Sequence, residues 1–141
     1  MISLIGGAAV AAGCNSPTSP RDQLLRALTQ HETQWRSAAI HAYAFDYDAN
    51  SMVTAPPVRI EVQGDTVARV VARETGAELS RAGWPTIDSL FVRAHDAIGN
   101  GQYQILISYD PQRGFPTRIA ANSSVPDTWF DLRVSSFVAG P

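Results

Sequence analysis

The sequence predicts an α+β fold: an antiparallel sheet with two helices packed on one face, in the element order α-β-β-β-α-β-β-β. Two segments carry apolar residues at helical spacing, and each is followed by segments in which apolar and polar residues alternate. The strand-helix-strand alternation of parallel sheets is absent from this pattern. A length of 141 residues with 45% apolar residues fits one globular domain. Because each half is a helix followed by three strands, an internal repeat is a further hypothesis.

The first helix is predicted from about Pro20 to Ala39. Ser19 is a suitable N-cap, and proline is favoured at the first helical position. We interpret His31 as a packed histidine and not as a ligand, because it lies on the apolar stripe of this helix. That stripe comprises Leu24, Leu28, His31 and Trp35.

The next segment alternates as a strand with one aromatic face. Tyr43, Phe45 and Tyr47 share one parity, whereas Asp46 and Asp48 lie on the other. We expect the aromatic face to be core and the two carboxylates to be solvated. The alternatives are that a curved sheet turns Tyr43, Phe45 and Tyr47 into the lining of a ligand groove, and that the two aspartates bind Ca²⁺ or act in acid–base chemistry.

A hairpin and a second helix are predicted next. Val58 to Val62 alternates, Gly64-Asp65 is a hairpin turn, and Val67 to Ala72 forms the returning strand. Residues 73–83 are polar and are expected to be irregular. The second helix extends from about Ile87 to Ile98, with Thr86 as its cap. Its apolar stripe predicts Phe91 as a core residue and comprises Ile87, Leu90, Phe91, Ala94 and Ile98.

Three further strands complete the prediction, at Tyr103 to Tyr109, Thr117 to Ala121 and Trp129 to Val138. In the last strand, one parity is expected to face the core: Phe130, Leu132, Val134 and Ser136.

The segment from Asp110 to Pro116 has the residues of a turn, since Asp-Pro starts turns and Gly114 permits a positive φ. The alternative to turn chemistry alone is a binding edge formed by Tyr109, Arg113 and Phe115.

The N-terminal segment divides into residues 1–13, a predicted signal peptide, residues 14–20, a lipidated cysteine and tether, and residues 21–141, the single domain. Cys14 is the single cysteine, so the chain has no intrachain disulfide and no thiolate metal site. Ala11-Ala12-Gly13-Cys14 resembles the bacterial lipobox, although the family prefers leucine where Ala11 stands. The resemblance implies secretion across the inner membrane and a lipid anchor on Cys14. Asn15 implies the outer membrane, facing the periplasm, in a diderm organism.

The rest of the chain resembles a family of uncharacterised bacterial lipoproteins, domain of unknown function 6174. The matching segments are Tyr43–Phe45, Pro57–Val62, Thr86–Phe91 and Tyr109–Ile119. Members often carry a cysteine pair after the first aromatic strand, and this chain has none, so a redox role possible in such members is not expected here. The resemblance implies fold and location, and no activity.

The charge and the motifs of the sequence argue against several classes of function. A formal net charge of −2 without a Lys/Arg run gives no reason to expect nucleic-acid binding. No apolar stretch reaches the length of about 18–20 residues that a spanning helix needs. His31, His41 and His95 have no metal-ligand spacing, and no catalytic set or cofactor motif is present.

The hypothesis is therefore a membrane-tethered envelope lipoprotein with a non-enzymatic binding domain, whose partner is another envelope protein. A small-ligand carrier, with a cleft between sheet and helices, is the alternative, and a hydrolase is a weaker one.

Overall fold

The computed structural model describes residues 18–101, 103–126 and 128–140. It confirms the α+β class and the element order, with one short strand added where residues 73–83 were expected to be irregular. The first helix ends two residues before Ala39. The elements are α1 (Pro20–Ser37), β1 (Tyr43–Ser51), β2 (Val58–Gln63), β3 (Thr66–Ala72), β4 (Glu78–Leu79), α2 (Ile87–Gly99), β5 (Tyr103–Tyr109), β6 (Pro116–Ser123) and β7 (Phe130–Ala139).

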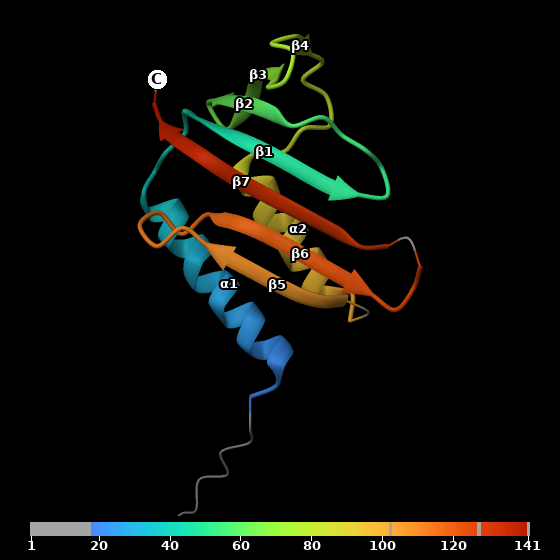
Figure 1. Cartoon of the computed structure of the whole chain (residues 1–141). Coiled ribbons are helices and arrows are strands. Elements are labelled where there is room, and N and C mark those ends of the chain that lie inside the picture. The colour runs from blue at the N-terminus through green and yellow to red at the C-terminus, as the bar shows by residue number, and fades with distance from the viewer. Residues whose placement is uncertain (1–17, 102, 127, 141) are drawn as a thin grey trace, which may run out of the picture.

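All seven strands form one sheet in the order β4-β3-β2-β1-β7-β6-β5, and every neighbouring pair is antiparallel (Figure 1). Helix α2 connects β4 at one edge of the sheet to β5 at the opposite edge. The chain then returns to the centre, where its last strand pairs with its first. The register joins Tyr43 to Ala139 at one end of this central pair and Ser51 to Phe130 at the other.

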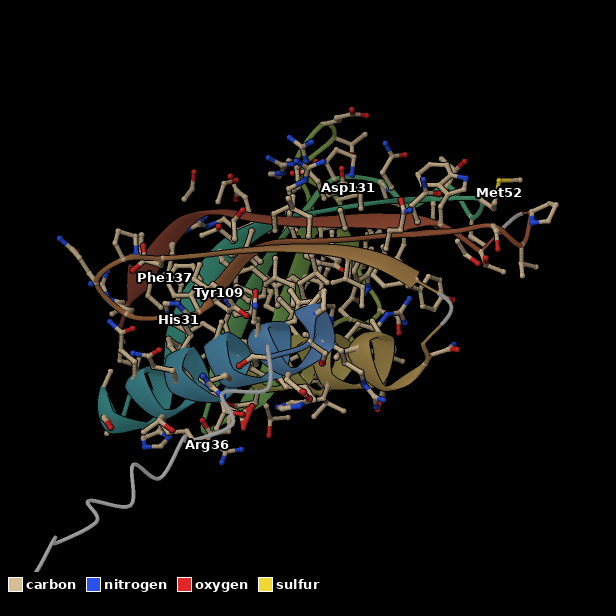
Figure 2. The ribbon with its side chains drawn as sticks, turned by 90° about the horizontal axis from the view of Figure 1, so that it is seen from below. His31, Arg36, Met52, Tyr109, Asp131 and Phe137 are labelled. Carbon is tan, nitrogen blue, oxygen red and sulfur yellow. The ribbon has the colours of Figure 1, made fainter. Side chains whose placement is uncertain are left out.

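Both helices cover the same face of the sheet, and the other face carries no helix (Figure 2). We call this second face the open face.

The arrangement excludes the hypothesis of an internal repeat. If the halves were repeats, β5, β6 and β7 would superpose on β1, β2 and β3. This superposition would keep the order of the strands across the sheet and the side on which the helices lie, but every strand would run in the opposite direction. Only a mirror reflection combines these three features, and a reflection cannot relate two segments of L-amino acids.

The aromatic face of β1 is part of the core, as expected. Tyr43, Phe45 and Tyr47 are all buried against the helices, so the alternative groove at these residues does not form. The Tyr43 hydroxyl accepts a hydrogen bond of 2.9 Å from the backbone N–H of Ile87, the first residue of α2. Burial raises the pKa of Tyr47 to about 12. These side chains tie the central strand to the start of the second helix.

The predicted caps and turn are present. The Ser19 hydroxyl accepts from the backbone N–H of Asp22, and Thr86 forms a capping box with Ser89. Gly64 and Asp65 have φ values of 57° and 61°, which suit a tight hairpin of the mirror-image type. Local sequence therefore fixes where both helices begin and where β2 turns into β3.

One strand departs from simple alternation. Ser136 was expected to face the core, and this expectation is wrong. The register between β1 and β7 shifts between Ala44 and Asp46, and Ser136 has a φ of 50°, which marks a β-bulge. The bulge turns Phe137 toward the helices in place of Ser136. There its ring stacks on Phe115 with ring centroids 4.5 Å apart and on Tyr43 at 5.5 Å.

A candidate binding surface on the open face of the sheet

The segment from Asp110 to Pro116 is a turn held against α1. The Asp110 carboxylate accepts hydrogen bonds from the backbone N–H groups of Gln112 and Arg113. The Gln34 side chain on α1 donates to the carbonyls of Pro111 and Gln112 at 3.3 and 3.1 Å. These bonds give the segment a structural role, as the turn interpretation predicts.

The three residues of the alternative binding edge are buried or partly buried. Phe115 is only 3% exposed. Tyr109 stacks on His31 with ring centroids 3.9 Å apart, and burial raises the pKa of Tyr109 to about 12. The Arg113 guanidinium lies 5.2 Å from the centre of the Phe137 ring. Tyr109 and Arg113 keep part of their surface accessible, and His31 is a packed histidine as expected.

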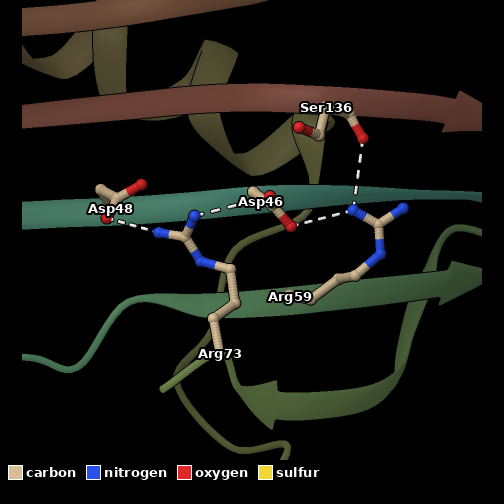
Figure 3. A network of polar contacts seen from close by, with 5 residues as sticks. All are labelled: Asp46, Asp48, Arg59, Arg73 and Ser136. Atoms are coloured by element: carbon tan, nitrogen blue, oxygen red, sulfur yellow. Dashed lines mark hydrogen bonds and ion pairs between the residues drawn. The ribbon is translucent and has the colours of Figure 1, made fainter.

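The open face carries a network of ion pairs over its central strands (Figure 3). Arg59 on β2 donates to Asp46 at 2.9 Å and to the carbonyl of Ser136 at 3.3 Å, so it satisfies a carbonyl at the bulge. Arg73, just after β3, donates to Asp48 at 2.6 Å and lies 3.5 Å from Asp46. Asp46 and Asp48 are therefore both paired with arginines.

The open face is hollowed over β5, β6 and the start of β7. The hollow has a volume of about 510 Å³. Most of its side chains point away from the helices, as the exposed position of Leu106 shows, and three residues of the core side border it, namely Ile105, Ala121 and Phe130. The lining residues are Asn50, Gln104, Ile105, Leu106, Arg118, Ala120, Ala121, Asn122, Trp129, Phe130 and Asp131.

A fixed ion pair lies in this hollow. Arg118 donates from Nε to Oδ1 of Asp131 at 3.0 Å and from Nη2 to Oδ2 at 2.8 Å, which is the bidentate geometry that orients both groups. The hydrogen bonds from Arg118 lower the pKa of the Asp131 carboxyl below its usual range. Arg133 adds a longer contact of 3.3 Å to the same carboxylate. The pair offers a planar, polar wall with no net charge.

Three carboxamides complete the polar lining, on Asn50, Gln104 and Asn122. Their side chains make no hydrogen bond to another residue in the described part of the chain, so they are available to a ligand. A second hollow of about 360 Å³ shares Asn50 and Asp131 with the first. The two hollows thus adjoin and form a trough that continues across the open face.

Exposed apolar side chains flank one end of the trough. The chain passes from β1 to β2 through a loop that bears Met52 and Val53, and from β6 to β7 through a loop that bears Val125 and Trp129. Both loops lie at the same end of the sheet, because Ser51 at the end of β1 pairs with Phe130 at the start of β7. Figure 2 shows Met52 at this end and Asp131 on the open face.

The core fills the middle of the space between sheet and helices, and hollows remain at its borders. There a hollow of about 390 Å³ lies between α1 and β5, lined by Pro20, Gln23, Leu24, Ala27, Ile105, Ile107 and Tyr109. Two smaller hollows, of about 260 Å³ each, also border the helices, and charged side chains line both. The expected cleft of a carrier is therefore represented by separate hollows at the borders of the helix layer.

The histidines pair separately. His41 contacts Asp65 at 2.9 Å, and His95 contacts Glu32 at 3.1 Å. Among the described residues, no group of three His, Cys, Asp or Glu side chains could hold a metal ion.

No helix within residues 18–101, 103–126 and 128–140 is long and apolar enough to cross a membrane. Cys14 and the predicted signal peptide lie outside the described residues.

The fold and this surface define a class: a small α+β domain with helices on one face of an antiparallel sheet and a polar trough on the other. The model of a family of unknown function, DUF6174, matches residues 27–135, and the chain belongs to this family. The match spans both helices, apart from the first turns of α1, and all seven strands up to the bulge in β7. No curated protein matches the chain.

Proposed function

We propose that this chain is a membrane-tethered envelope lipoprotein whose domain is a non-enzymatic binding module. The Ala-Ala-Gly-Cys step that ends at Cys14 supports the tether, together with the Ser- and Pro-containing segment that follows it. Several acyl chains on one cysteine would hold the protein durably, whereas one chain anchors only marginally.

One observation carries the binding role: the open face is free of helices and bears a trough of accessible carboxamides beside an exposed indole. An antiparallel sheet often leaves one face to solvent, but such a face is ordinarily covered with charged pairs, as over β1 and β2 here. Over β5 to β7 the ion pair of Arg118 and Asp131 is joined by apolar side chains, those of Leu106, Ala120 and Trp129. A hollowed face with apolar side chains and a few fixed polar groups is typical of a binding site.

A site-specific photo-crosslinker tests this role in intact cells. Placed at Leu106, which is 51% exposed in the trough, the crosslinker should capture a discrete adduct. Val92 on α2 is 59% exposed and lies on the helix layer, so the same crosslinker there is a matched control. If the crosslinker formed adducts equally well at Leu106 and at Val92, the proposal that the open face binds a partner would be wrong.

The tether is tested separately by Cys14→Ser. We expect this variant to leave the membrane fraction or to stay unprocessed, because serine offers no thiol for acylation. The measurement is fractionation with mass analysis of the mature N-terminus. Wild-type protein that begins with an unmodified Met1 and fractionates like the variant would contradict the tether.

A small-ligand carrier is the second candidate. Its support is the volume of the first hollow, about 510 Å³, which lies within the range of about 300–1,000 Å³ for ligand pockets. The carrier site would then lie on the open face and not between sheet and helices.

A further inference from the structure

We propose that the trough on the open face binds a neutral oligosaccharide. This inference rests on the binding role proposed above and names the chemistry of its ligand. A sugar ring has apolar C–H faces and an edge of hydroxyl groups, each of which donates and accepts hydrogen bonds. A site for it needs an accessible apolar surface next to groups that both donate and accept.

Trp129 supplies the apolar surface. Its side chain is 38% exposed although it lines the hollow, so a large part of the indole is open to a ligand. Leu106 and Ala120 extend this surface across the two outer strands. An indole combines a large apolar body with an N–H donor, and it loses little conformational freedom when a ligand covers it.

The three carboxamides supply the matching polar groups. Each has two N–H donors and one carbonyl acceptor, which suits hydroxyl groups better than it suits an ion. Gln104 on β5 lies opposite Asn122 on β6, and Asn50 on β1 lies opposite Asp131 on β7, so the carboxamides reach the hollow from three different strands. The fixed guanidinium and carboxylate of Arg118 and Asp131 add donors and acceptors whose positions are already set.

The charge balance selects a neutral ligand. The charged residues among the described linings of the two hollows are Arg118, Arg133, Asp48 and Asp131, two of each sign, and both arginines donate to Asp131. An anionic ligand would have to displace the Asp131 carboxylate from Arg118, and a cationic one would have to displace Arg118 from Asp131. A polyol uses the outer lone pairs and N–H groups of the pair without breaking it.

The shape of the trough favours a chain of sugars over a single one. The hollows of about 510 and 360 Å³ adjoin through Asn50 and Asp131, and both open onto the surface. A polymer can therefore lie across the face and leave at either end, whereas an enclosed pocket would admit only a small molecule.

Calorimetric titration of the purified full chain with maltotetraose, cellotetraose and the anionic tetragalacturonate tests the proposal. We expect saturable binding of at least one neutral probe, and weaker binding of tetragalacturonate. Trp129→Ala should weaken that binding about tenfold or more, as truncation of a central aromatic anchor commonly does. Trp129→Phe, which keeps an apolar ring, should lose less. Val53→Ala is the control, since Val53 is an exposed residue of the neighbouring loop that does not line either hollow.

Three results would overturn the proposal: no saturable binding of either neutral probe, tighter binding of tetragalacturonate than of both, or an unchanged affinity in Trp129→Ala. The unlipidated Cys14→Ser chain serves equally well in this titration, so the outcome does not depend on the tether. If crosslinking from Leu106 still captures an adduct while all three probes fail, the binding role stands and the saccharide assignment falls.

Discussion

Replacement of Phe91 by alanine is expected to lower the free energy of unfolding by about 3–5 kcal/mol, the range for removal of a fully packed phenylalanine. Phe91 is 2% exposed and lies in the hydrophobic core between α2 and the sheet. The loss combines the transfer of a large apolar side chain with the cavity that remains, because close-packed neighbours relax only partly. Urea titration followed by circular dichroism measures the change.

The neighbouring residue Val92 provides the control. It lies on the same helix but is exposed to solvent, so Val92→Ala should change the free energy of unfolding by less than about 0.5 kcal/mol. Equal losses in the two variants would mean that α2 does not present Phe91 to the sheet. That result would contradict both the sequence-based stripe and the packing described above.

Gly114→Val should also destabilise strongly, by about 2–5 kcal/mol, from two separate causes. Gly114 has a φ of 82°, and left-handed backbone costs an L-residue about 1–2 kcal/mol. A Cβ at this position would also lie 2.6 Å from the carbonyl oxygen of His31 and 2.9 Å from Oε1 of Gln34. Overpacking of this kind typically adds about 1–3 kcal/mol, because the turn must move away from α1.

Gly76 separates the two causes. Its φ is 72°, close to that of Gly114, but a Cβ there would meet nothing within 4 Å. Gly76→Val should therefore show the backbone cost alone, about 1–2 kcal/mol. Thermal melting and urea titration of both variants give the comparison. If Gly114→Val and Gly76→Val had the same melting temperature, the close approach of the turn to α1 would contribute nothing to the loss of stability.

Sequence predicts most of this fold because its signals are local. Ser19 and Thr86 cap the helices in the structure as their side-chain chemistry predicts. The parity of Tyr43, Phe45 and Tyr47 identifies the buried face of β1 correctly. In β7, alternation predicts the core-facing residues correctly only as far as Val134. The bulge at Ser136 changes the alternation, and it depends on pairing with a strand about ninety residues earlier in the chain.

The candidate site is less accessible to sequence-based prediction. Alternation places Leu106 and Asp131 on the face opposite the core, but it gives no measure of whether that face is flat or hollow. Arg118 and Asp131 lie on neighbouring strands whose pairing the sequence does not specify. The residues of the turn from Asp110 to Pro116 suggested a binding edge, whereas Gly114 and the carbonyl of Pro111 contact α1 in the structure.

The pairing of β1 with β7 has a consequence for the order in which this chain can acquire its structure. Its sheet cannot close until residues 130–139 are available, since β1 otherwise stays an unprotected edge. Contacts between such distant parts of a chain raise the loop-closure entropy and slow folding. The central strand β1 therefore lacks its β7 neighbour until the last residues of the chain have been synthesised.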